Sequence, residues 1–217
     1  MPSKILLGVQ HSSEPGEFQS VATRIDNYFH ANRLQSLLPW APKRQLGLEL
    51  PKDYLEKEKF RIVTHFFGPL AQYFRSKKID IVPLEENDAW KYSQAIEFAK
   101  NVQNGIISKN KVQNELRRVQ TILASADAMY WPLEKIFPLH YQAEQYKTAL
   151  DILEGWGTEA KIAQVDKDSA SAREKHVLDE IVRQRPAMVV IGDGHARVLQ
   201  EKLQAYGYRY EKMAKNS

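Results

Sequence analysis

Short apolar runs alternate with longer amphipathic segments at the two ends of this chain. A short apolar run that ends at glycine, proline or a charged residue is typical of a buried strand, whereas apolar residues three or four positions apart predict a helix. Strands and helices in alternation predict parallel strands joined by helical crossovers. The predicted strands are 5–7, 46–50, 79–84, 187–191 and 208–212, and the predicted helices are 18–37, 53–78, 173–184 and 196–206.

The middle of the chain, residues 86–160, has a different pattern without strand-like runs. Long amphipathic segments predict three helices there, at 91–102, 109–129 and 140–154, separated by breakers such as Pro138. We therefore expect one α/β domain over residues 1–217. Its central sheet is mostly parallel and flanked by helices, and residues 86–160 form a helical insert or subdomain within it.

Composition places the chain among ordinary globular proteins. It has 217 residues, 43% of them hydrophobic and 27% charged, and no stretch approaches the roughly 18 apolar residues of a membrane span. No signal segment precedes the first predicted strand, so we expect a cytoplasmic protein without a membrane partner. The absence of cysteine excludes disulfides, thiolate catalysis and cysteine zinc sites. The net charge of +4 is mild and scattered, which does not favour nucleic-acid binding, and a homo-oligomer stays open.

One motif occurs twice, far apart in the sequence. A run of three or four apolar residues is followed by glycine, two further residues and histidine, once ending at His11 and once at His195. Each histidine then follows the carboxyl end of a predicted strand, which is where open α/β sheets bind ligands. In a parallel sheet these ends share one edge, so we expect the two imidazoles to belong to one site. The alternative for each is a helix cap or a backbone hydrogen bond.

Carboxylates accompany the two histidines at this expected edge. Glu49 lies between Leu48 and Leu50 in a predicted strand, so it is a candidate buried carboxylate, although alternation could also turn it to solvent. Glu85 and Glu86 follow the third strand. Glu85 could converge with the two histidines and Glu49 at this edge, but we expect both glutamates to be solvated loop charges. Two imidazoles and a carboxylate suit a divalent ion such as zinc, manganese or cobalt, which would activate water. Without a metal, the same groups could act as general acid and base.

Small residues around the two motifs are candidates to line a cofactor. These are Gly8 in the first motif and Gly192, Asp193 and Gly194 in the second. The alternative is that the glycines permit close packing and that Asp193 is a turn residue.

A charged pair precedes the second motif. Arg173 and Glu174 lie in the first turn of the helix predicted over 173–184, which Ser169 or Ser171 could cap. Glu174 could simply favour the positive helix end, and Arg173 could be a surface charge. Alternatively, the Arg173 guanidinium reaches the site to bind a carboxylate or an oxyanion.

The order of these features resembles the TraB/TIKI proteins. These belong to a wider superfamily that includes erythromycin esterases and the haem-binding ChaN proteins. The resemblance covers about residues 1–85 and 165–210, whereas the middle matches as generic helices. Where the family usually has Gly-Thr-x-His, this chain has Gly8-Val9-Gln10-His11 and lacks the threonine hydroxyl.

The resemblance implies metal-dependent hydrolysis of peptide bonds or of small-molecule esters. It implies that His11 and His195 are metal ligands or acid–base groups, and that Glu49 is the metal-binding or catalytic carboxylate. Arg173 and Glu174 would be the supporting catalytic pair.

Two other functions stay open. One is a non-catalytic module of the same fold that binds haem or a metal ion. The other is an interaction protein, or a nucleic-acid-associated one, that uses the helical middle and the basic surface.

Overall fold

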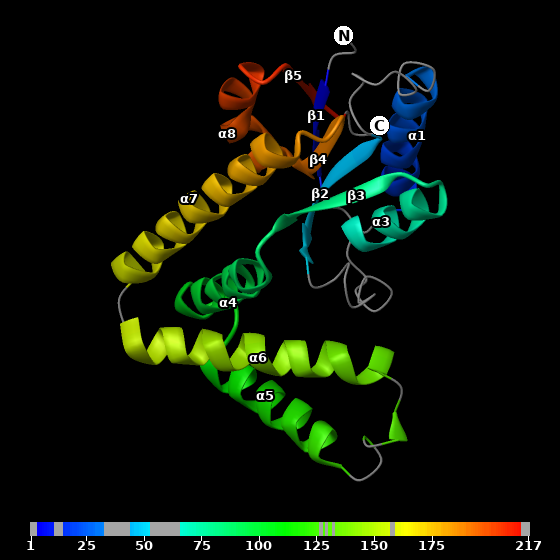
Figure 1. Ribbon diagram of the computed structural model, residues 1–217. Helices are drawn as coiled ribbons and strands as arrows, with labels where there is room; N and C mark the ends of the chain where they lie inside the picture. Colours follow the sequence, from blue (N-terminus) through cyan, green and yellow to red (C-terminus); the bar gives the residue numbers. More distant parts are fainter. Residues whose placement is uncertain are drawn as a thin grey trace. The chain divides into compact units, whose positions relative to one another are not determined.

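The computed structural model describes residues 4–10, 15–32, 44–52, 66–125, 128, 130–131, 133–156 and 159–213. The chain forms two compact units, one of residues 1–85 with 174–217 and one of residues 86–173. The elements in chain order (Figure 1) are β1 (Lys4–Val9), α1 (Pro15–Ala31), β2 (Gln45–Pro51), α3 (Phe67–Ser76), β3 (Asp80–Glu85), α4 (Asn87–Gln103), α5 (Lys109–Ala124), α6 (Leu133–Trp156), α7 (Glu159–Gln184), β4 (Met188–Gly192), α8 (Asp193–Gln204) and β5 (Tyr208–Lys212).

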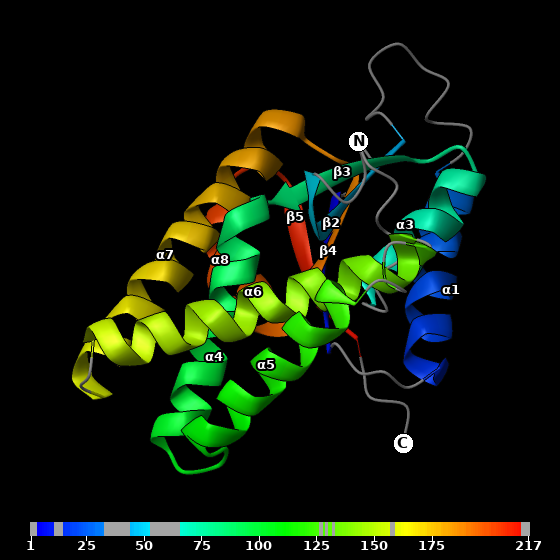
Figure 2. The same ribbon diagram turned by 90° about the horizontal axis from the view of Figure 1, so that it is seen from below.

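The first unit is built on a five-stranded parallel sheet with the order β3-β2-β4-β1-β5. The predicted α/β class with a parallel sheet and flanking helices is confirmed. The three central strands are apolar runs buried on both faces, as parallel sheets require. β5, predicted over residues 208–212, is an edge strand in which Tyr208 is buried while Arg209 and Lys212 are exposed. Figure 2 shows α1 and α3 on the opposite side of the sheet from α8.

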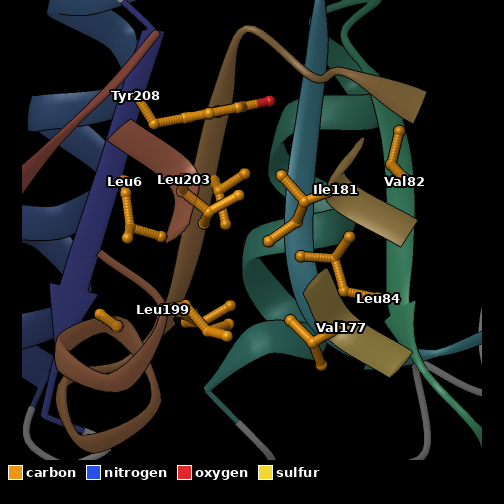
Figure 3. Close-up of a cluster of buried hydrophobic side chains, with 11 residues drawn as sticks. Leu6, Val82, Leu84, Val177, Ile181, Leu199, Leu203 and Tyr208 are labelled. Atoms are coloured by element: carbon orange, nitrogen blue, oxygen red, sulfur yellow. The ribbon is translucent and has the colours of Figure 1, made fainter. Parts of the chain in front are cut away.

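One face of the sheet packs against α8 and the carboxyl-terminal half of α7 (Figure 3). Alternate residues of the strands point to this face, among them Leu6 and Leu84. They meet Val177 and Ile181 from α7 and Leu199 from α8. Gly47 permits close packing on the same face, because a Cβ there would lie 3.1 Å from Leu84, 3.2 Å from Pro186 and 3.3 Å from Val189.

The second unit is helical, with α4, α5, α6 and residues 159–173 of α7. Its buried cluster contains small residues such as Ala95, Ala99 and Ala149, packed around Ile152 and Ile162. Small side chains let the helices approach closely. The cap of α5 is a serine, since the Ser108 hydroxyl accepts a hydrogen bond from the Lys111 amide at 3.2 Å.

Two helix boundaries predicted from the sequence are wrong. α7 extends over Glu159–Gln184, so the helix does not begin at Arg173, and neither Ser169 nor Ser171 is its cap. The reason is that no glycine or proline interrupts residues 159–184. α6 likewise begins at Leu133 and continues through Pro138, which was expected to separate helices. Proline is tolerated near a helix start, where it removes few backbone bonds.

The helices predicted over 18–37 and 109–129 end earlier than expected, at Ala31 and Ala124, and those predicted over 91–102 and 196–206 agree with α4 and α8 to within four residues. The helix predicted over 53–78 is described from Phe67, as α3, and residues 53–65 lie outside the described part of the chain. Across the described ranges, no helix is long and apolar enough to cross a membrane.

Candidate functional site at the carboxyl edge of the sheet

A buried carboxylate marks the carboxyl end of β2. The side chain of Glu49 is 4% exposed. Its Oε2 accepts a hydrogen bond of 2.5 Å from the amide of Gly192, the residue that caps the amino terminus of α8. A backbone donor at the positive end of a helix lowers the cost of burying a negative charge. The first unit therefore places a carboxylate where its strand neighbours are apolar.

One imidazole lies between this carboxylate and a second one. His195 Nε2 is 3.7 Å from Glu49 Oε1, and His195 Nδ1 is 3.5 Å from Glu174 Oε1. All three residues belong to the α/β unit. The His195 side chain is 27% exposed and that of Glu174 is 22% exposed, so the group opens to solvent on one side. We call Glu49, His195 and Glu174 the carboxylate–histidine cluster.

The packing of the core places these three side chains together. On α7, Glu174 lies three residues before Val177, and on α8, His195 lies four residues before Leu199. Residues at these spacings share a helix face, so the faces that bury Val177 and Leu199 also carry Glu174 and His195. On β2, Glu49 is two residues after Gly47 and so points to the same face of the sheet. The three side chains of the cluster therefore lie on the same faces of α7, α8 and β2 as the apolar core in Figure 3.

The cluster fits a cation by its charge and comes close to fitting one by its spacing. It contains two carboxylates for one imidazole, so its net charge is negative even when the imidazole is protonated. Two side-chain atoms that bind one tetrahedral divalent ion lie roughly 3.3–3.6 Å apart, given metal–ligand distances of about 2.0–2.2 Å. The separation of 3.7 Å between Glu49 Oε1 and His195 Nε2 is slightly larger than this.

Glu174, the second carboxylate of the cluster, lies where it can orient the His195 imidazole. Histidines that bind metals usually donate their other ring N–H to a carboxylate or a carbonyl. Glu174 lies on the Nδ1 side of His195, at 3.5 Å, which is the place of such a partner when Nε2 binds a metal ion. The described residues supply two ligands in this way. Within them, no group of three or more His, Asp or Glu side chains is arranged to bind a metal ion.

Two of the expected site residues have no described place in the cluster. His11 lies outside the described residues, two positions after the end of β1. Arg173 is a half-buried residue in the interior of α7 and the last residue of the helical unit.

Glu85 is a correction to the sequence analysis. We expected it to be a solvated loop charge, but it ends β3 and is 3% exposed. β3 continues one residue further than the apolar run suggested, and Glu85 pairs in register with Pro51 of β2. Glu86, the next residue, is exposed as expected.

The glycines of the two motifs have separate roles in the fold. Gly192 ends β4 and caps α8, and Gly194 is exposed in the first turn of α8, with open space around its Cα. Gly8 is packed tightly, since a Cβ on it would lie 2.8 Å from Asp193 Oδ1. Gly192 and Gly194 thus form the turn from β4 into α8, and Gly8 permits a close contact between β1 and Asp193.

Asp193 is bound by three partners that the sequence analysis did not name. The hydroxyl of Tyr210 donates to its Oδ1 at 2.5 Å, Arg197 pairs with its Oδ2 at 2.8 Å, and Lys212 lies 3.7 Å from the same oxygen. The hydrogen bond from Tyr210 lowers the pKa of Asp193, while burial opposes and the two cations assist that change. Burial and the bond to Asp193 raise the pKa of the Tyr210 hydroxyl.

A sequence signal for Tyr210 existed in the alternation of Tyr208 and Tyr210 along the last strand. Alternation places both rings on one face of the sheet, and Tyr208 and Tyr210 both pack against the cluster of Figure 3. The sequence could not tell which of the two hydroxyls reaches the carboxyl edge.

Comparison with known proteins gave no relative. No protein-family model matches the chain, and no match was found among curated proteins or among solved structures.

Proposed function

We propose that this chain is a metal-dependent hydrolase whose centre is the carboxylate–histidine cluster. The observation that carries the proposal is a single imidazole between two carboxylates at the carboxyl edge of a parallel sheet. This edge is where open α/β proteins bind their ligands. The ordered motifs and their resemblance to the TraB/TIKI proteins favour hydrolysis of peptide bonds or of small esters.

Each residue of the cluster has a distinct task in this proposal. Glu49 Oε1 and His195 Nε2 bind the divalent ion, and the Gly192 amide fixes the Glu49 carboxylate through Oε2. Glu174 orients the imidazole through Nδ1. His11, expected from the sequence, is a candidate further ligand. When bound, the ion supplies Lewis acidity toward water and toward a substrate carbonyl oxygen.

Without a bound metal ion, the same geometry would give the cluster a different task, the transfer of protons. His195 is partly exposed and lies within ion-pair distance of the buried Glu49 carboxylate and of the partly exposed Glu174 carboxylate. An imidazole so placed, with Nε2 not bound to a metal ion, can take a proton from an attacking water and return it to a leaving group. Glu174 stabilises the imidazolium that forms in the first of these steps.

The first experiment measures binding of Zn²⁺, Mn²⁺ and Co²⁺ to the purified full chain by calorimetry. We expect one bound ion, lost in Glu49→Gln and His195→Ala and bound roughly 10–100-fold more weakly in Glu174→Gln. His176→Ala is the matched control, because it removes a histidine of α7 two residues from Glu174, and it should bind like the wild type. Equal binding by wild type and Glu49→Gln would contradict the proposal.

The second experiment separates a hydrolase from a non-catalytic module. Hydrolysis of unstructured peptides and of a chromogenic ester should require the ion, fall with chelator and be absent in His195→Ala. Metal binding without turnover would instead favour the non-catalytic alternative. A Soret band on adding haem that depends on His195 would favour the haem-binding form of that alternative.

A further inference from the structure

The first turn of α8 is attached to strands on both sides of β4 in the sheet, to β2 on one side and to β5 on the other. On the β2 side, Glu49 accepts the hydrogen bond from the Gly192 amide. On the other side, Asp193, the first residue of α8, accepts the hydrogen bond from Tyr210 of β5. β5 is next to β1, and β1 is next to β4, so the tyrosine bond crosses over β1.

Gly8 of β1 makes this crossing possible. The bond between Tyr210 and Asp193 passes directly over Gly8, since a Cβ at Gly8 would lie 2.8 Å from Asp193 Oδ1 and 3.0 Å from Tyr210 Cε2. Real Cβ atoms do not approach an oxygen this closely, so any larger residue would displace the carboxylate. The glycine of the first motif therefore makes room for the aspartate of the second motif.

His195 shares this turn with Gly192 and Asp193. With Gly192 as the helix cap, Asp193 and His195 are the first and third helical residues. Separating Asp193 from Tyr210 would therefore remove a restraint on the backbone that carries the imidazole. Tolerances at catalytic and metal sites are tight, about 0.5 Å, so a small displacement matters.

We infer that Tyr210 and Asp193, with Gly8 beneath them, are positioning residues that fix the His195 imidazole against Glu49 and Glu174. The inference rests on the proposed function in that His195 is its central imidazole. It gives β5, an edge strand with no residue in the carboxylate–histidine cluster, the task of positioning His195 through Tyr210. Arg197 of α8 and Lys212 of β5 also pair with Asp193, and the Lys212 pair, at 3.7 Å, is a second and longer contact between this turn and β5.

Tyr208 offers a matched control on the same strand. Its hydroxyl donates a hydrogen bond of 2.7 Å to the carbonyl of Pro186, at the opposite edge of the sheet. Tyr208→Phe and Tyr210→Phe each remove one hydroxyl and one long-range hydrogen bond. A purely structural role for Tyr210 would make the two variants alike in everything except the size of the stability loss.

The test records the ring nitrogens of His195 by long-range ¹H–¹⁵N NMR of the full chain without metal. The pH is the same for all variants. Signals are assigned by their loss in His195→Gln. In Tyr210→Phe we expect the Nδ1 and Nε2 shifts to change, because the imidazole is no longer fixed in one position between Glu49 and Glu174. Tyr208→Phe should retain the wild-type shifts.

A double-mutant cycle sharpens the result. Asp193→Ala and Tyr210→Phe remove the same bond, so the double variant should displace the signals no further than Asp193→Ala does. If Asp193→Ala does not fold, Gly8→Ala replaces it, since the added methyl displaces the same carboxylate. Zn²⁺ affinity, where the wild type binds the ion, should fall roughly tenfold in Tyr210→Phe and stay unchanged in Tyr208→Phe.

Two results would overturn the inference. One is a His195 spectrum in Tyr210→Phe that is identical to the wild type, and the other is an equal change in Tyr208→Phe. A wild type that binds no metal would instead contradict the proposed function, while the NMR comparison of the two tyrosine variants would still decide the inference.

Discussion

The two units of this protein differ in what they bury. Among the described residues, the buried charged side chains are Glu49 and Glu85, and both belong to the α/β unit. The described ion pairs of the helical unit, such as Lys109 with Glu154, are at its surface. A carboxylate can be buried where a helix start or a strand end offers a backbone donor, as the Gly192 amide does for Glu49. Among the described residues, the sheet unit therefore contains the buried carboxylates, and the helical unit has a core of apolar contacts.

The largest expected effect comes from two isoleucines on the same helix. Ile162 and Ile181 of α7 are both fully buried. Ile162 lies in the core of the helical unit, and Ile181 lies in the core of the α/β unit. Replacing either with alanine should lower the free energy of unfolding by about 2–5 kcal/mol, measured by urea denaturation.

These two substitutions also test the separation of the units. Ile181→Ala should weaken Zn²⁺ binding, because Ile181 packs on the helix face that carries Glu174. Ile162→Ala should leave Zn²⁺ affinity unchanged. Equal losses of affinity would break the comparison between the two units.

A smaller effect is expected at the buried carboxylate. Glu49→Ala leaves the Gly192 amide without its acceptor, which should cost about 1–3 kcal/mol of unfolding free energy. Glu49→Gln retains an acceptor oxygen and should cost less. Glu154→Ala, in the helical unit and with a 62% exposed side chain, should change stability by less than about 0.5 kcal/mol. A Glu49→Ala variant as stable as the wild type would show that the hydrogen bond does not support the fold.

The cap of α5 offers a local test of the helical unit. Ser108→Ala removes the acceptor for the Lys111 amide and should lower stability by about 1 kcal/mol. Ser108→Asp retains a capping oxygen and should restore the loss. Neither variant should alter metal affinity or the ring signals of His195, and a change in either signal would couple the helical unit to the cluster.

The smallest expected effect depends on pH. Burial raises the pKa of Glu211, but hydrogen bonds from Arg24 and Arg209 lower it by more than burial raises it. The pKa of Glu211 is therefore below the ordinary value. The bonds therefore stabilise the fold above about pH 4.3, the ordinary pKa of glutamate, and this contribution is lost as the pH falls through the lower folded pKa. Glu211→Gln should cost about 0.2–1 kcal/mol near pH 7, and the difference from the wild type should shrink in acid. A constant difference in denaturation midpoints across this range would contradict the assignment.

Much of the fold could be predicted from local pattern. The strands at 46–50, 79–84, 187–191 and 208–212 lie within a residue of those in the structure, because a short apolar run between breakers has few alternatives. The start of α7 could not be predicted from local pattern, because the serine, aspartate and alanine residues within 166–172 tolerate both a loop and a helix interior. There, packing of Ile162 against α4 and α6 decides the outcome.

The candidate site divides in the same way. The sequence by itself determined that Glu49 is a carboxylate in an apolar strand and that His195 follows another strand. Both conclusions depend only on a short apolar run and the residue that ends it, Pro51 in one case and Gly192 in the other. Tertiary structure decided that Glu174 joins them and that Tyr210 reaches Asp193 across Gly8. These contacts depend on which helix faces pack on the sheet and on the strand order, and residues so far apart in sequence meet through packing that no local pattern encodes.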